Sequence, residues 1–450
     1  LLAKLRAGGS DDRVRETLTR DEVLGMLRRL RRSNSKNGSM ADVRQTVMAQ
    51  ARQLHGHGVA LEETDNDTFE LFSLFISQLQ RELRVGSPGE ALLERLRLPL
   101  LQLALRDQDF FVDPSHPARM LLDAVSLAGA RWLAEDDLDK QWLGLLQRAV
   151  ATAQEDADAT PDIFVVANHA LQDGLHAAAR KTDMAERRQV DAARGREKLD
   201  LARQRATREI ADLIGGRSLP RFHAILLDQA WTDVLSLALL RGGEDSVTWR
   251  ELRSTTAAIV DASAATSPAA RDPAFTLRIQ GALGQVGYHS EDAAAIARQL
   301  AHGQMEDADL ASRTELIVQL KSRTRLGEEN VSHAVNPQPP LSTAEQLAHA
   351  QLATLIKARW VDLLEPGDDS VVRRRLAWVS PRSGHALLTN RRGQRAAGGN
   401  LDALARMFAA GRLSLVADDV PPATIAWQAT VSALERIAGG NESEGAAHDQ

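Results

Sequence analysis

The chain has 450 residues, of which 43% are hydrophobic and 26% are charged, and its formal net charge at pH 7 is −6. This composition is typical of a globular protein long enough for about two to four domains. Cysteine is absent, which excludes disulfides, thiolate metal ligands and cysteine nucleophiles. The acidic balance argues against a protein that coats nucleic acid, so we do not expect a nucleic-acid partner.

The residue types favour helices over strands. Aromatic residues make up only 4% of the chain, whereas Ala, Leu, Arg and Glu are abundant. We therefore predict a mainly α fold: a multi-helix body with a small C-terminal antiparallel β module, barrel-like and packed by helices.

No segment predicts a membrane span. The longest apolar stretch, residues 225–240, contains Asp228 and Asp233 and falls short of the roughly 18 uninterrupted apolar residues that a span requires. The lack of cysteine fits a reducing compartment, and we expect a cytoplasmic protein.

The N-terminal region, residues 1–182, and a second region, residues 215–330, are predicted to be helical. Apolar residues recur at helical spacing through both, as in Phe69, Phe72 and Ile76, and Gly or Pro clusters interrupt the pattern. The pattern predicts roughly a dozen packed helices.

One stretch of the N-terminal region, residues 109–119, combines aromatic and polar side chains. Ser115 and Pro117 are suited to begin a helix, which would account for most of the pattern. The alternative is that His116 and Arg119 face a binding surface.

Residues 183–214 carry charges of both signs at almost every second position and few large apolar side chains. This pattern predicts a solvated connecting helix, because no heptad seam of apolar residues is sustained. Such a helix could serve as an exposed docking element for a protein partner.

The C-terminal part begins after a Pro-rich linker, residues 331–345, and forms a predicted α+β module over residues 346–438, followed by a disordered tail over residues 439–450. Its predicted elements are a helix over 343–355, a strand over 360–363, a turn over 365–369, a hairpin of strands 371–380 and 385–390, and helices over 401–409 and 424–437 that could cover the apolar face.

Arginines concentrate around this hairpin. Residues 357–395 contain nine Lys or Arg against four Asp or Glu. Alternation along the first hairpin strand places Leu376 and Trp378 on one face and Arg373 and Arg375 on the other. The candidate ligand-binding residues are Arg373, Arg375, Trp378, Asn390, Arg391, Arg392 and Arg395. Guanidinium groups favour phosphate or carboxylate partners, although charge also protects sheet edges from aggregation.

Other motifs give weaker signals. Gly281, Gly284 and Gly287 have the spacing of a helix end rather than of a dinucleotide-binding loop. His55 and His57 lie near acidic residues but lack the spacing of a zinc or calcium site. We expect no metal and no cofactor, and a binding protein rather than an enzyme.

Three segments resemble an uncharacterised bacterial family, domain of unknown function 1631. They are residues 109–119, residues 231–249 (WTDVLSLALLRGGEDSVTW) and residues 373–393 (RRRLAWVSPRSGHALLTNRRG). Members are often labelled thymidine phosphorylase, so the resemblance implies nucleoside metabolism as one alternative, although no glycine-rich phosphate loop is visible. The last segment also loosely resembles a PilZ domain, which binds cyclic di-GMP, through the R-x-x-x-R spacing of Arg391 and Arg395.

We therefore expect a cytoplasmic regulatory or scaffold protein. Its helical body would contact protein partners, and its arginine-rich module would bind an anionic ligand such as cyclic di-GMP or another nucleotide. A pure protein-interaction module and an enzyme of nucleoside metabolism are the alternatives.

Overall fold

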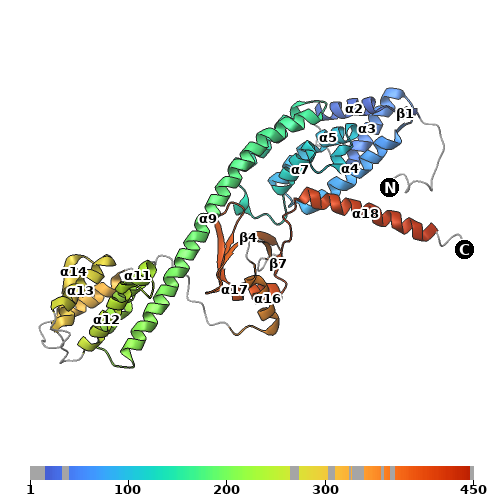
Figure 1. Cartoon of the computed structure of the whole chain (residues 1–450). Helices are drawn as coiled ribbons and strands as arrows, with labels where there is room; N and C mark the ends of the chain where they lie inside the picture. The colour runs from blue at the N-terminus through green and yellow to red at the C-terminus, as the bar shows by residue number, and fades with distance from the viewer. Residues whose placement is uncertain are drawn as a thin grey trace. The chain divides into compact units, whose positions relative to one another are not determined.

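A computed structural model of the chain describes residues 16–32, 40–263, 273–302, 310–323, 326, 339–355, 359–364 and 370–445. The chain divides into two compact units, the first comprising residues 1–189 and 341–450 and the second residues 190–340. Figure 1 identifies their elements along the chain. The predicted turn over 365–369 and most of the Pro-rich linker lie outside the described residues.

The first unit contains a helical body that precedes a long helix and is completed by the last helix of the chain. Its elements are β1 (Glu16–Leu18), α2 (Arg20–Arg32), α3 (Met40–His55), β2 (Val59–Leu61), α4 (Glu63–Glu82), α5 (Pro88–Arg106), α6 (Asp109–Val112), α7 (Pro117–Leu127), the 3₁₀ turn η1 (Glu135–Asp137), α8 (Lys140–Glu155), the start of α9 (Pro161–Ile214) and α18 (Pro422–Gly445).

Helix α5 runs through the core of this body. Ser87 caps it by accepting a hydrogen bond from the Glu90 amide, and Pro88 occupies the first turn, where a missing N–H costs little. Every side chain from Leu98 to Leu105 is buried, as expected for a helix surrounded by other helices.

Helix α18 corrects one prediction from the sequence. The helix itself was expected, but it packs on α4 and α7 of the helical body instead of covering the β module. Trp427 stacks on Phe111 with ring centroids 5.6 Å apart, and Ala423 and Ala426 are buried in the body's core. The predicted tail over 439–450 begins within this helix, and its last residues, 446–450, lie outside the described part.

The β module of the first unit is an antiparallel sheet of five strands in the order β6-β5-β4-β3-β7. Helices α16 and α17 contribute Leu352, Leu401 and Leu404 to a core beneath the strands. Among the described strands β6 and β7 are edges that do not pair, so the barrel-like closure expected from the sequence is not formed. The elements are α16 (Thr343–Ala353), β3 (Arg359–Leu364), β4 (Val371–Val379), β5 (His385–Thr389), β6 (Arg395–Asn400), α17 (Leu401–Ala409) and β7 (Leu413–Leu415).

A bulge in β4 reverses the predicted side-chain alternation. The register pairs Leu376 with Leu388, then Trp378 with Leu387, and shifts between Leu376 and Trp378. Because Leu376 and Leu388 pack in the core, the extra residue turns Trp378 to the opposite face. The prediction that Trp378 shares a face with Leu376 is therefore wrong.

The second unit is helical and has a separate core. Its elements are the remainder of α9, α10 (Arg221–Leu226), the π-helical turn η2 (Leu227–Trp231), α11 (Thr232–Gly242), α12 (Val247–Ala262), α13 (Pro273–Gln285), α14 (Ser290–His302) and α15 (Leu310–Ser322).

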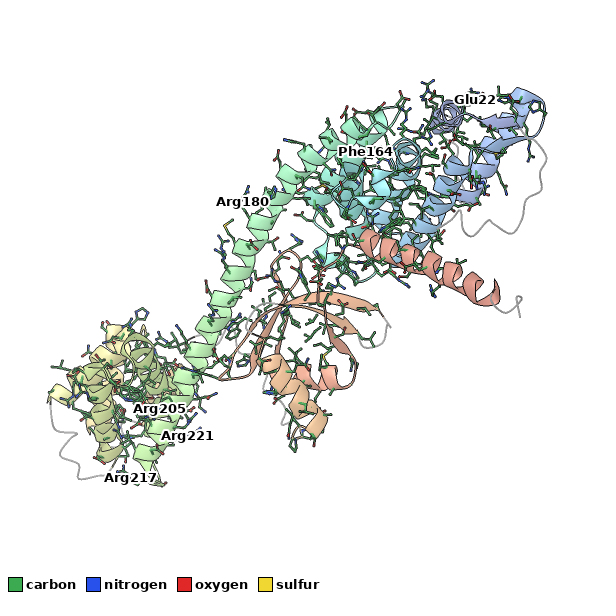
Figure 2. The ribbon with its side chains drawn as sticks, turned by 45° about the vertical axis from the view of Figure 1, so that its right-hand side comes forward. Glu22, Phe164, Arg180, Arg205, Arg217 and Arg221 are labelled. Carbon is green, nitrogen blue, oxygen red and sulfur yellow. The ribbon has the colours of Figure 1, made fainter. Side chains whose placement is uncertain are left out.

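Helix α9 changes environment along its length, as the side chains labelled in Figure 2 illustrate. Phe164 is fully buried in the core of the first unit, whereas Arg180 is exposed. Arg205, farther along, binds Glu244 within the second unit. Among the described residues no helix is apolar over enough of its length to cross a membrane.

Candidate functional site

The arginines around the hairpin bind carboxylates of the chain itself. Arg373 lies opposite Asp362 in the sheet register and donates two hydrogen bonds to it, at 2.8 and 3.0 Å. Its remaining terminal nitrogen lies 3.1 Å from Asp419. Burial opposes the charged form of Arg373, but the hydrogen bonds that it donates to Asp362 and Asp419, together with their negative charges, outweigh this effect and raise the pKa of the guanidinium.

Arg391 is held between two tryptophans. Its guanidinium carbon lies 4.5 Å from the ring centroid of Trp132 and 4.7 Å from that of Trp360. One terminal nitrogen of Arg391, Nη2, contacts both carboxylate oxygens of Asp419, with a distance of 2.6 Å to Oδ2. Burial lowers the pKa of Arg391, and the Asp419 carboxylate opposes this effect.

A second pair of carboxylates comes from the turn before α8. Asp137 is 4% exposed and accepts hydrogen bonds from the Arg391 amide at 2.6 Å and from the Arg374 guanidinium at 3.1 Å. Burial raises the pKa of Asp137 despite these donors. The Asn390 side chain donates to Asp136, so the turn after β5 is tied to the helical body.

The same turn also lies against α9. Gly393 has φ +69°, and a Cβ on it would meet the Thr182 carbonyl oxygen at 2.3 Å and the Glu186 nitrogen at 2.9 Å. Arg375 reaches Glu186 at 3.3 Å. Asn390 accepts hydrogen bonds from two amides that follow it in the turn, which fixes its shape.

These contacts separate the predicted arginines into two groups. Arg373, Arg375 and Arg391 fasten the β module to the helical body or to its own strands, while Arg392 and Arg395 are exposed. Their role as ligand-binding residues remains a prediction.

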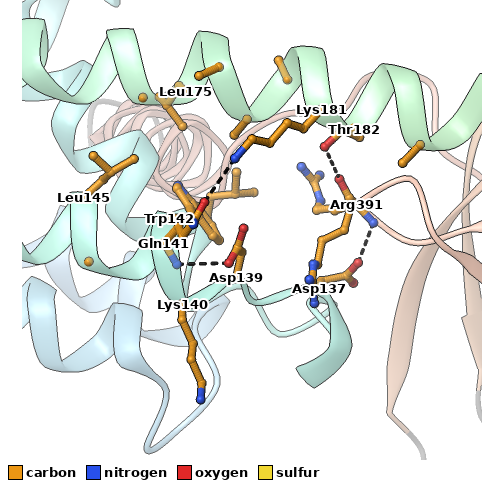
Figure 3. Close-up of a pocket in the computed structure, with 18 of the residues that line it drawn as sticks. Asp137, Asp139, Lys140, Gln141, Trp142, Leu145, Leu175, Lys181, Thr182 and Arg391 are labelled. Carbon is orange, nitrogen blue, oxygen red and sulfur yellow. Dashed lines mark hydrogen bonds between the residues drawn. The ribbon is translucent and has the colours of Figure 1, made fainter.

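We call the contact of the Asn390–Gly393 turn with Asp136, Asp137 and α9 the junction. A cleft of about 940 Å³ lies beside it, within the first unit. Figure 3 shows its walls: α8 on one side, α9 on the other and the turn that carries Arg391 at one end. Its apolar side chains include Trp142, Leu145 and Leu175, which are half-buried and continuous with the core of the helical body. The full lining is Leu127, Asp137, Asp139, Lys140, Gln141, Trp142, Gly144, Leu145, Arg148, Gly174, Leu175, Ala177, Ala178, Ala179, Lys181, Thr182, Asp183, Ala185, Arg391, Arg392 and Gln394.

Charged side chains border the apolar floor. Lys140, Arg148, Lys181 and Arg392 are exposed cations of the lining. Lys181 donates to the Gln141 side chain at 3.3 Å, a contact visible in Figure 3. The cleft can therefore receive a group with an apolar face and anionic edges.

The prediction that His116 and Arg119 face a binding surface is not met. Their exposures are only 5% and 4%. His116 is the N-cap of α7 and accepts from the Ala118 amide, and Arg119 stacks on Phe75 and Trp427 with centroid distances of 4.9 and 5.4 Å. Helix α18 covers Arg119, which contacts Trp427 and donates to the Ala423 carbonyl, while His116 packs against Phe110.

Several residues of the junction were not singled out from the sequence. Trp132, Trp360 and Asp419 surround Arg391, and Trp142 and Leu145 form the cleft floor. Tryptophan is scarce, with seven in the chain, so the position of Trp360 shortly before the arginine-rich strand was a usable signal, whereas Trp132 and Trp142 lie far from that strand in the sequence. No group of three or more metal-ligating side chains is found among the described residues.

Comparisons with known proteins place family domains in succession along the chain. A model described as the second domain of "Protein of unknown function (DUF1631)" matches residues 17–159, and one for the third domain matches residues 192–301. A model for the C-terminal tudor domain of the same family matches residues 348–416. Neither the curated proteins nor the solved structures yielded a match.

These descriptions name no activity, so they add no support to the thymidine phosphorylase label. The C-terminal module is described as a tudor domain, and its resemblance to PilZ domains stays a prediction. The three matches follow one another in the family's own order, cover most of the chain and agree with the sequence resemblance. The chain belongs to the DUF1631 family.

Proposed function

We propose that the protein is a scaffold that binds a segment of a partner protein in the cleft between α8 and α9. The observation that carries the proposal is the composition of this cleft. Its volume of about 940 Å³ is at the upper end of the range for ligand sites, and its floor presents Trp142, Leu145 and Leu175 to solvent.

The junction supports this assignment because it gives the cleft a rigid end wall. The Asn390–Gly393 turn is tied to Asp137 and packs directly on the backbone of α9. A preorganised wall lowers the entropic cost of binding a partner. The tudor-domain description of the module that supplies this wall also fits an interaction role.

Site-specific photocrosslinking tests the proposal. Gln141 and Gln147 are both exposed glutamines of α8, but only Gln141 lines the cleft. A photoreactive amino acid at position 141 should capture a defined partner in cells of the source organism, and the same group at 147 should not. The captured band should disappear when Leu145→Glu places a charge on the floor. Equal capture from both positions, or capture unchanged by L145E, would refute the proposal.

A small anionic ligand such as cyclic di-GMP is a second candidate, favoured by the exposed cations Lys181 and Arg392 at the cleft. Calorimetric titration of the full chain with cyclic di-GMP tests it. Binding weakened by Lys181→Ala with Arg392→Ala would support this ligand. The absence of heat, or binding indifferent to the double substitution, would remove it.

A further inference from the structure

We infer that the cleft takes an acidic amphipathic helix of the partner protein, lying along α8 and α9 with its backbone close to Gly144. This inference rests on the proposed function and names the partner class. It follows from the groove's shape, its charge and the position of one glycine.

The shape of the cleft matches a short helix. Its lining on α8 runs from Lys140 to Arg148 and on α9 from Gly174 to Ala185, which at 1.5 Å per residue are lengths of about 12 and 16 Å. A helix of two to three turns has this length, and a groove between two helices suits the ridge of a third. The lining residues belong to helices, loops and a turn, with no sheet edge for an extended peptide.

Gly144 is a helix-interior glycine of the lining with open space where its side chain would be. A Cβ on Gly144 would meet no atom within 4 Å. Gly174, across the same cleft, differs, because its Cβ would lie 2.3 Å from Leu145 Cδ1. Packing within the chain therefore accounts for Gly174 but not for Gly144, although glycine weakens a helix. The free space over the α8 backbone is suited to the close approach of a partner's backbone.

The charge of the rim selects an acidic partner. The lining contains four exposed cations but only two carboxylates outside the ion pairs described above. The cations are Lys140, Arg148, Lys181 and Arg392, and the carboxylates are Asp139 and Asp183. Asp137 and Arg391, which also line the cleft, bind each other. Asp139 already has a partner within the chain, because it caps α8 by accepting a hydrogen bond from the Gln141 amide. Lys140 and Arg148 belong to α8, Lys181 to α9 and Arg392 to the turn, so acidic side chains on both flanks of an apolar helix face would meet cations from either wall. In Figure 3 Lys181 extends toward Gln141, whereas Lys140 points away from Lys181.

A displayed peptide library tests the inference with the full chain as bait. The peptides, about 16 residues long, carry leucines at helical spacing and a random choice of Glu, Lys or Gln elsewhere. The counter-bait is Gly144→Leu, which adds an apolar side chain to the lining at a position where a Cβ meets no atom of the chain within 4 Å. The matched control is Gly195→Leu, since Gly195 is also a helix-interior glycine with nothing within 4 Å but lies outside the cleft.

The expected result is enrichment of Glu over Lys among peptides that the wild type retains, with affinity reduced at least about tenfold by G144L and unchanged by G195L. Lys181→Glu with Arg392→Glu should shift the selection toward Lys. Arg180→Glu with Arg187→Glu should not, because these exposed arginines lie on α9 outside the lining.

Different failures separate this inference from the proposed function. Neutral or basic peptides that still depend on Gly144 would overturn the acidic partner and leave the docking cleft standing. If no peptide prefers the wild type over G144L, the helical partner is overturned, and crosslinking from Gln141 then decides the proposed function independently. Acidic peptides that bind G144L as well as wild type would show attraction elsewhere on the surface and overturn the inference.

Discussion

The contact between the Asn390–Gly393 turn and α9 can be tested with a pair of matched substitutions. Gly393 and Gly384 both have φ +69° and both lie in turns of the β module. A Cβ on Gly393 would lie 2.3 Å from the Thr182 carbonyl oxygen, a backbone atom, whereas on Gly384 the nearest atom would be Leu401 Cβ at 3.8 Å. Alanine at the two positions therefore shares the backbone strain and differs in the clash.

The expected magnitudes follow from these two terms. The left-handed conformation costs alanine about 1–2 kcal/mol at either position. At Gly393 the turn must also move away from α9 by roughly 1 Å to reach ordinary contact distance. This movement disturbs the hydrogen bond from the Arg391 amide to Asp137, now 2.6 Å long, at a cost of about 1–3 kcal/mol. We expect Gly393→Ala to destabilise the junction by about 1–3 kcal/mol more than Gly384→Ala.

Hydrogen exchange of the full chain measures this difference locally. Amides of the turn, such as those of Asn390 and Gly393, should exchange about tenfold or more faster in G393A than in G384A, since 1.4 kcal/mol corresponds to a factor of ten. Peptides from α11 in the second unit provide an internal reference, and their exchange rates should be the same in both variants. Equal exchange in the two variants would refute the conclusion that the turn packs directly on α9.

Three further predictions concern polar groups of the cores and of the β module. Arg391→Ala should destabilise the β module by about 1–3 kcal/mol, because it removes two aromatic contacts and one of the two arginines that bind Asp419, whereas Arg392→Ala on the exposed neighbour should have little effect; hydrogen exchange over 385–397 measures both. Burial raises the pKa of Asp137, so as the pH falls its carboxylate takes up a proton in the folded chain before it does so in the unfolded chain. The free energy of unfolding of the wild type, relative to that of Asp137→Asn, should therefore decrease as the pH rises above the ordinary range of an aspartate. Denaturation at several pH values measures this difference. Thr256→Val should destabilise the second unit by about 1–3 kcal/mol in urea unfolding, because it leaves the buried Trp231 indole N–H without its 2.7 Å acceptor, and unchanged unfolding would contradict this.

The strands of the β module were predictable because their signals are local. Pro381 and Gly384 bound a hairpin loop, and the predicted strands 371–380 and 385–390 agree with β4 and β5 within one residue at each end. The bulge at Ala377 has no comparable signal, because a single extra residue changes the pairing without changing the composition. It was enough to move Trp378 to the other face.

The partners of the arginines were not predictable from the sequence alone. Asp136 and Asp137 lie more than 230 positions before Arg374, and Asp419 lies 28 positions after Arg391. Only the packing of the β module beside the turn preceding α8 brings them together. The same limit applies to α18, whose apolar face fits the helical body although it follows the β module in the chain.

The arginine network gives the cleft its end wall. Burying charged groups is costly, and a buried ion pair often contributes little net stability compared with apolar packing. It does restrict the arrangement, because Arg391 must meet two tryptophan faces and the Asp419 carboxylate at once. An apolar contact would tolerate a shifted turn, but this combination fixes the turn that contributes Arg392 to the lining of the cleft. The concentration of arginine that marks this part of the sequence thus supports a positioning role for the buried side chains and leaves recognition to the exposed ones.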